Sequence, residues 1–235
     1  SSSYNTKPVI GKTGIIYANL NGGLSAVSPD GNILWSNASI QCPQTKFDMA
    51  IDGDDNLYTL MSNNVIVKVN SSGTIVWTSN FNVTSFGFVI DGYGNIYCID
   101  WFQNILYSVN PSGKLKWSKT GINNWTTPVI TNDNKIIIDS NLYVVAYDTS
   151  GKSLWKSQKL DYYTEWLKLD DNNNLYYFAS YSIGQILVGS LNPNGELRWI
   201  YNSGLSSATN APPILLPDGK VLFSPKRAYQ IQAIN

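Results

Sequence analysis

Short apolar segments recur along the whole chain, and turns rich in Gly, Asn, Asp, Pro and Ser separate them. The first group of segments covers residues 8–10, 16–18, 24–27 and 33–35. Each segment is only a few residues long, which is too short for a helix and typical of a strand. The turn before the last segment contains Pro29, which presets the backbone for a hairpin. The pattern therefore predicts four short antiparallel strands in each group.

The fourth segment of each group ends in a repeated motif, a glycine followed four residues later by tryptophan. Successive tryptophans of the motif are 42, 40, 38 and 44 residues apart, a period typical of four-stranded propeller blades. We therefore predict a single all-β domain over residues 1–235, a β-propeller of six blades. The motif occurs at 31–35, 73–77, 113–117, 151–155 and 195–199, and the repeats cover about 7–38, 47–80, 87–120, 127–158, 166–202 and 212–235.

The sixth repeat lacks its outermost strand, because no Gly-x-x-x-Trp motif follows residue 212. Three arrangements are open. Residues 1–6 pair there, the sixth blade has three strands, or the parent protein continues. We expect an incomplete or terminus-closed last blade.

A repeat unit reads Pro-Val-Ile, turn, Ile-Tyr, turn, Leu-x-Ala-Val, Pro-Asp-Gly and x-x-Leu-Trp. It resembles the PQQ-like β-propeller repeat of the quinoprotein alcohol dehydrogenase-like superfamily over nearly the whole chain. The resemblance implies either a cofactor-dependent dehydrogenase or an outer-membrane assembly scaffold without cofactor. Family members that bind the quinone have eight blades, vicinal cysteines and a calcium site, whereas Cys42 and Cys98 lie far apart in this sequence. We therefore expect no cofactor.

Composition narrows the classes of function. Sixteen basic and sixteen acidic residues cancel, so no net field attracts nucleic acid. Histidine is absent, which excludes histidine-dependent nucleophiles and histidine-ligated metals. No apolar run reaches the roughly 18 to 20 residues needed to insert in a membrane. A low charge content of 14% with many aromatic residues favours an extracellular or cell-surface location.

Some loops carry aromatic residues that the repeat does not require. In a four-stranded blade, the loop leading into the innermost strand and the loop joining the second and third strands emerge on one face. Rings beside Asn and Asp suit sugars, which stack on a flat ring and offer hydroxyls for hydrogen bonds. We therefore predict a groove for polysaccharide or glycan, the alternative being a protein-binding patch. The groove residues are Trp101, Phe102, Trp125, Tyr162, Tyr163 and Tyr181.

Other aromatic residues recur once per repeat at a fixed phase, which is what stacking of repeats demands. We assign these residues, together with Trp166 beside the apolar Leu167, to packing rather than to ligand contact. The set contains Trp35, Trp77, Trp117, Trp155 and Trp199, and the tyrosines Tyr17, Tyr58, Tyr97 and Tyr176.

Acidic residues also fall on the aromatic face. Asp100 and Asp139 occupy matching ends of adjacent second strands, and we include both in the ligand site. Asp48, Asp161 and Glu165 lie in the loops leading into innermost strands. Two suitably spaced carboxylates suffice for a glycosidase. Acids in such loops are also commonly hydrogen-bonded turn residues.

These observations together predict a non-catalytic binding module that holds no metal. Its ligand is polysaccharide or glycan, with a protein-interaction scaffold as the alternative and a glycoside hydrolase as the third possibility. We expect a monomeric module of a larger extracellular protein, without nucleic-acid binding or membrane insertion. The repeat places Cys42 in a loop and Cys98 in a strand, which favours free thiols over a disulfide.

Overall fold

The computed structural model describes residues 6–20, 22–43, 47–122, 126–160, 164–180, 185–206, 214–216, 220–223 and 232–234. The regular elements among them are all strands. The chain divides into two compact units, unit 1 (Ser1–Ile122) and unit 2 (Asn123–Asn235). In the described ranges, no helix has the length and apolar character to cross a membrane.

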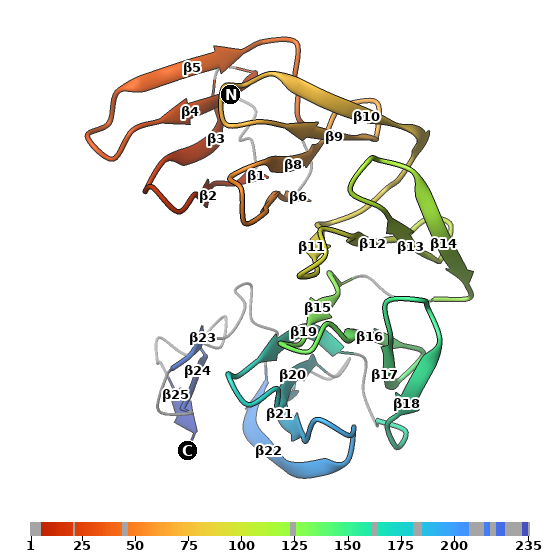
Figure 1. Cartoon of the computed structure of the whole chain (residues 1–235). Helices are drawn as coiled ribbons and strands as arrows, with labels where there is room; N and C mark the ends of the chain where they lie inside the picture. The colour runs from red at the N-terminus through yellow and green to blue at the C-terminus, as the bar shows by residue number, and fades with distance from the viewer. Residues whose placement is uncertain are drawn as a thin grey trace. The chain divides into compact units, whose positions relative to one another are not determined.

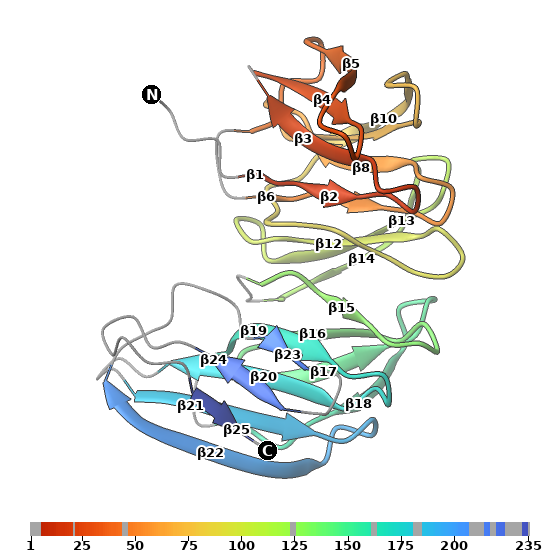
Figure 2. The same cartoon turned by 90° about the vertical axis from the view of Figure 1, so that its left-hand side faces the viewer.

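Unit 1 contains three four-stranded antiparallel sheets and one short parallel pair of strands. In each sheet every strand pairs with the next one in sequence (Figures 1 and 2). The first strands of consecutive sheets are neighbours. The strands are β1 (Thr6–Lys7), β2 (Val9–Ile10), β3 (Ile16–Leu20), β4 (Gly23–Val27), β5 (Ile33–Asn37), β6 (Phe47–Asp48), β7 (Ala50–Ile51), β8 (Leu57–Leu60), β9 (Val65–Val69), β10 (Ile75–Asn82), β11 (Val89–Ile90), β12 (Ile96–Asp100), β13 (Ile105–Val109) and β14 (Leu115–Thr120).

Unit 2 repeats this order with two four-stranded antiparallel sheets and, among its described residues, a three-stranded one. The first strands of its two complete sheets are again neighbours. The strands are β15 (Val129–Ile130), β16 (Ile136–Ser140), β17 (Tyr143–Tyr147), β18 (Ser153–Lys156), β19 (Thr164–Leu169), β20 (Leu175–Ser180), β21 (Gln185–Leu191), β22 (Leu197–Ser206), β23 (Ile214–Leu215), β24 (Val221–Phe223) and β25 (Gln232–Ile234).

The repeated all-β fold predicted from the sequence is confirmed by five four-stranded sheets, while the number of blades stays a prediction. One pairing was not predicted. Thr6, considered above for the missing outer strand, pairs with Phe47 in a parallel ladder that also joins Lys7 to Asp48. Asp48 forms a further parallel bridge to Gly87. The segments that lead into three consecutive sheets of unit 1 are therefore linked backbone to backbone.

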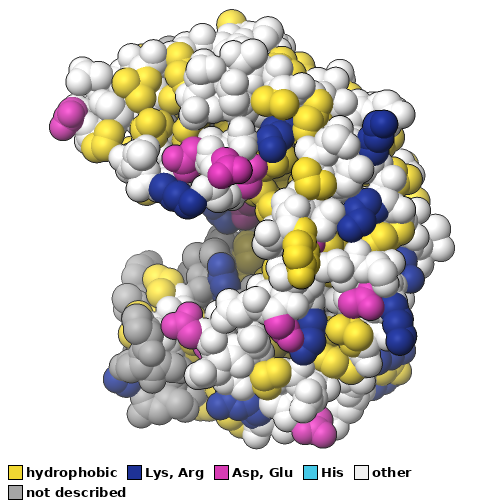
Figure 3. Space-filling model, viewed as in Figure 1, with side chains coloured by type: hydrophobic (Ala, Val, Ile, Leu, Met, Phe, Trp, Pro, Cys, Tyr) yellow, Lys and Arg dark blue, Asp and Glu magenta, His cyan; other side chains and the backbone are white. Residues whose placement is uncertain are grey.

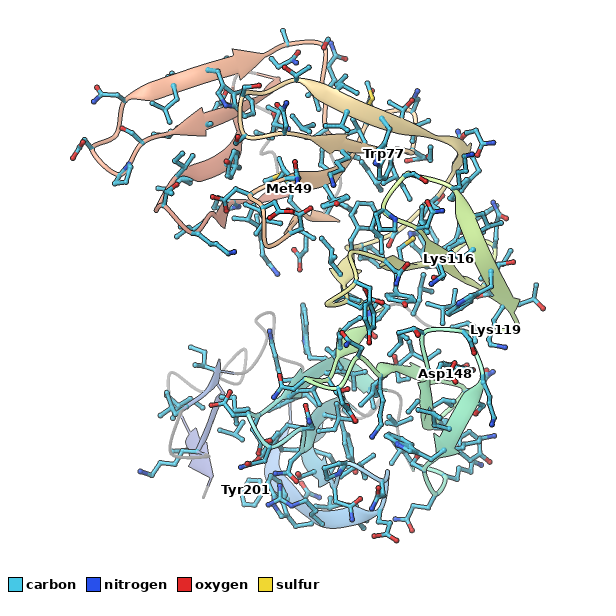
Figure 4. The ribbon with its side chains drawn as sticks, viewed as in Figure 1. Met49, Trp77, Lys116, Lys119, Asp148 and Tyr201 are labelled. Atoms are coloured by element: carbon cyan, nitrogen blue, oxygen red, sulfur yellow. The ribbon has the colours of Figure 1, made fainter. Side chains whose placement is uncertain are left out.

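The repeated tryptophan joins one sheet to the next. The Trp77 ring lies against Gly113, where an added Cβ would be 2.7 Å from the indole. Its Nε1 donates to the Pro111 carbonyl at 2.9 Å, and Trp77 is labelled in Figure 4. Glycine is required because its φ is +81° and because a side chain would displace the ring. The same packing joins Trp35 to Gly73 and Trp155 to Gly195, which confirms the predicted packing role of these three tryptophans.

We call this contact between a tryptophan and the glycine of the next sheet the joint. The repeated tyrosine supports each joint from inside its own sheet. The ring centroids of Tyr58 and Trp77 lie 6.0 Å apart, and the Tyr58 hydroxyl donates to Asp52 at 2.8 Å. Asp52 also accepts the backbone N–H of Asn56 at 2.9 Å, so one carboxylate closes the turn and positions the ring. The predicted structural role of the tyrosines is confirmed. Equivalent bonds join Tyr97 to Asp91 and Tyr176 to Asp170.

The turns between first and second strands also bond from one sheet to the next. In unit 1 the Lys12 backbone N–H donates to Asp55 Oδ1 at 2.9 Å. In unit 2 the Asn132 N–H donates to Asn173 Oδ1 at 2.8 Å, and its side-chain amide donates to the Asp171 carbonyl. Asp55 and Asn173 both have positive φ, 59° and 61°. We call this contact the turn clasp.

Candidate functional site

An aromatic patch, which we define as Phe86, Trp101 and Phe102, combines two residues of the turn between β12 and β13 with Phe86 from the segment before β11. Phe86 and Trp101 are half-buried, and Phe102 is exposed. The rings of Trp101 and Phe86 are stacked, with centroids 5.8 Å apart and planes 16° apart. Phe102 meets Trp101 edge to face at 6.1 Å and 88°. Phe102 is 75% exposed, the largest exposure among the large hydrophobic side chains of the described residues. The patch therefore presents one open ring on a base of two stacked rings.

Asp100 builds the turn that holds this patch. Its carboxylate accepts the backbone N–H groups of Phe102 at 2.9 Å, Gln103 at 2.8 Å and Thr84 at 2.9 Å. The side chain is only 1% exposed. The Trp101 N–H donates to the Thr84 carbonyl at 3.1 Å, which fixes the turn to the segment before β11. Asp100 therefore positions the aromatic rings and does not face solvent as a free acid.

Asp139 has a different environment in unit 2. Thr126 Oγ1 donates to its Oδ1 at 2.8 Å, and Thr164 Oγ1 donates to its Oδ2. Both acids lie at the end of a second strand, as predicted, but their positions differ by one residue. Asp100 pairs with Ile105 as the fifth residue of β12, whereas Asp139 pairs with Val144 as the fourth residue of β16. Because side chains alternate along a strand, the two carboxylates point to opposite faces of their sheets.

The remaining predicted residues divide into two groups. Asp48 forms an ion pair with Lys7 at 2.9 Å, with both side chains partly exposed. Trp166 packs partly buried against the cluster of Tyr176, Phe178 and Val188, which confirms its structural role. The other residues, and the side chain of Glu165, lie outside the described residues: Trp125, Asp161, Tyr162, Tyr163 and Tyr181.

The sulfur and acidic groups of the described residues give no metal site. No group of three or more Cys, Asp or Glu side chains is placed to hold an ion in those ranges. Cys42 and Cys98 are free and buried, as predicted. Burial raises the pKa of both thiols, so neither is a reactive thiolate near neutral pH.

A cavity in unit 2 was not predicted from the sequence. It has a volume of about 270 Å³ and lies between the segment after β18 and the sheet β19–β22. Its base is Tyr177, whose ring lies across Gly189 so closely that an added Cβ would be 2.1 Å from Cζ. Glycine inside a strand marks such a close approach, and this was the signal available in the sequence. The lining residues are Gln158, Lys159, Leu160, Tyr177, Ala179, Leu187, Ile200 and Asn202.

Charged side chains do not form a large region of one sign on the face shown in Figure 3, where acidic and basic groups are interspersed. This distribution agrees with the equal numbers of acidic and basic residues. Specific recognition on that face therefore depends on local groups rather than on a long-range field.

Comparison with known proteins identifies the repeat. A family model described as outer membrane protein assembly factor BamB matches residues 20–159. No curated protein gives a significant match. Several solved structures are similar in fold. Virginiamycin B lyase from Staphylococcus aureus is 14% identical with a TM-score of 0.72, and the alignment covers 100% of this chain and 83% of the lyase.

Two further structures support the same fold. BamB from Moraxella catarrhalis is 15% identical over 91% of this chain and 67% of its own, with a TM-score of 0.62. The C-terminal WD40 domain of Sif2 is 16% identical over 92% and 64%, with a TM-score of 0.70. All three are β-propellers. At these identities the likeness shows a β-propeller fold for the chain and nothing about its ligand.

Proposed function

Because the chain belongs to the family described as outer membrane protein assembly factor BamB, we propose that it is a non-catalytic scaffold that binds another polypeptide through the aromatic patch. The exposure of Phe102 is the observation that carries this proposal. A ring that is 75% exposed on a fixed turn has little conformational freedom to lose on binding. Such anchors contribute much of the affinity at protein interfaces.

The surroundings of the patch support binding rather than catalysis. Asp100, the nearest carboxylate in the turn, already accepts three N–H groups. A general acid or nucleophile would need an accessible oxygen in contact with substrate. The family description also names an assembly factor, and on that basis we propose that the protein works outside the cytoplasm, as one module of a larger assembly.

A glycan is the second candidate ligand, supported by the residue next to Phe102. Gln103 adds an amide beside the exposed ring, and its Oε1 accepts the Tyr107 hydroxyl at 3.4 Å. A flat ring with an adjacent amide suits a pyranose, whose apolar face stacks while its hydroxyls form hydrogen bonds. Of the residues predicted for a glycan groove, unit 1 contains Asp100, Trp101 and Phe102.

A paired variant tests both candidates. Phe102→Ala removes the exposed ring, and Tyr93→Ala is the control because Tyr93 is 69% exposed on the β11–β12 turn of the same sheet. Wild type and both variants are probed on a random peptide array and on a glycan array. We expect peptide binding that Phe102→Ala reduces at least tenfold and Tyr93→Ala leaves unchanged.

The glycan candidate takes precedence if only glycans bind and Phe102→Ala abolishes that signal. Equal binding by all three proteins on both arrays would contradict any role for the patch.

A further inference from the structure

The unit 2 cavity follows from the pairing of three strands. Tyr177, Gly189 and Ile200 form one row across β20, β21 and β22, because Tyr177 pairs with Gly189 and Gly189 with Ile200. The next row on the same face contains Ala179, Leu187 and Asn202. Side chains two residues apart in a strand share a face, so these two rows make a continuous floor. Ile200 and Asn202 flank Tyr201, which lies on the other face of β22 (Figure 4).

The opposite wall is the segment after β18, which is held in place by backbone bonds. Leu160 is buried, and its N–H donates to the Leu142 carbonyl at 2.7 Å. Leu142 has a φ of +69°. At the same position before the third strand, the three sheets of unit 1 have Gly22, Asn64 and Asn104, residue types that tolerate positive φ. A bulky residue such as leucine with a positive φ lowers the free energy of unfolding. Backbone strain of this kind is concentrated at binding sites.

The charge in the lining of the cavity is positive. Lys159 is the one charged residue of the lining, and its ammonium has no ion-pair partner among the described residues. The side-chain amide of Gln158 adds hydrogen-bond donors, and this side chain is exposed. The floor residues Ala179 and Leu187 are almost fully buried. An apolar floor with a cationic rim is complementary to an apolar ring that carries a negative group.

We propose that this cavity binds a small organic anion, an aromatic or aliphatic ring with a short carboxylate tail. The ring lies on the floor formed by Tyr177, Leu187 and Ile200, and the carboxylate faces Lys159. The volume of about 270 Å³ equals about nine water molecules at ~30 Å³ each, which suits a phenyl ring with a short tail. The site lies wholly in unit 2, so it is independent of the aromatic patch and of the function proposed for it.

Two probes that differ only in charge test the proposal. 3-Phenylpropionate and its neutral amide, 3-phenylpropanamide, are titrated into the full chain by calorimetry and by ligand-observed NMR. We expect the carboxylate to bind at least tenfold more tightly, since a charge-assisted hydrogen bond favours it. The proposal would be overturned if neither probe bound, or if the two probes bound with equal affinity.

Three variants locate the bound probe. Lys159→Gln should remove the preference for the carboxylate, while Ile200→Ala should weaken both probes several-fold. Lys152→Gln is the matched control, because Lys152 is an exposed lysine of the same unit that does not line the cavity, and it should bind like wild type. Near-UV circular dichroism confirms that each variant is folded. A charge preference that survives Lys159→Gln, or that Lys152→Gln also removes, would overturn the assignment.

Discussion

Trp77 and Trp101 lie in neighbouring sheets of unit 1 and have opposite surroundings. Trp77 lies against Gly113, donates to the Pro111 carbonyl and packs beside Tyr58. Trp101 stacks on Phe86 in an exposed turn and supports the open ring of Phe102. The first position recurs in every complete repeat of the sequence, whereas the second occurs once. Phase in the repeat, rather than residue type, therefore decides whether an aromatic ring joins sheets or faces a partner.

The largest expected effect comes from breaking a joint. Trp77→Ala removes an indole from between two sheets, and large-to-small changes of this kind cost about 3 to 5 kcal/mol of unfolding free energy. Urea denaturation followed by circular dichroism measures the change. A loss below about 1 kcal/mol would mean that the tryptophan does not hold the sheets together.

Filling the joint from the other side should have the next largest effect. Gly113→Ala places a Cβ 2.7 Å from the Trp77 ring at a φ of +81°, and we expect a loss of about 2 to 4 kcal/mol from strain and overpacking. Gly31→Ala is the matched control, because Gly31 has a φ of +85° with nothing within 4 Å. It should cost only about 1 kcal/mol. Equal losses of unfolding free energy in the two variants would mean that the contact with the tryptophan does not contribute to the effect.

Asp52, which accepts the hydroxyl of Tyr58, should make stability depend on pH. Burial raises the pKa of Asp52, but the hydrogen bonds from Asn56, Tyr58 and Asp54 outweigh it, so the folded-state pKa is lowered. The carboxylate therefore stabilises the protein above its unfolded pKa of about 4, and the contribution is lost as the pH falls through the folded value. Asp52→Asn should lower stability by about 1 kcal/mol at pH 7. The difference from wild type should shrink below about pH 4 in acid unfolding curves, and a constant difference would contradict this.

The smallest effect on stability is expected at the patch. Phe102→Ala removes an exposed ring and should change the unfolding free energy by no more than about 0.5 kcal/mol, even where it abolishes binding. Thermal unfolding beside the array measurements checks both quantities in one protein. A stability loss comparable to that of Trp77→Ala would place Phe102 among the packing residues and end the contrast.

The fold could be predicted from the sequence because the strand pattern and the Gly-x-x-x-Trp motif each occur several times along the chain. The functional features could not, since each depends on a single pairing between distant residues. Asp100 and Asp139 differ by one position in strand register, and that difference reverses the face of the sheet. The cavity depends on the alignment of Gly189 with Tyr177 and Ile200, which a periodic pattern does not specify. Likewise, the pairing of Thr6 with Phe47 joins segments that no local motif connects.

In both places where the turn clasp is seen, the earlier sheet is the donor and the sheet that follows it is the acceptor. This is the head-to-tail arrangement of heterologous subunit contacts, here inside one polypeptide. A repeat whose turn supplied both the donor and the acceptor would bring both halves of the contact with it when its gene segment is duplicated. A chain built on such a contact could then gain or lose whole repeats without needing a new kind of interface.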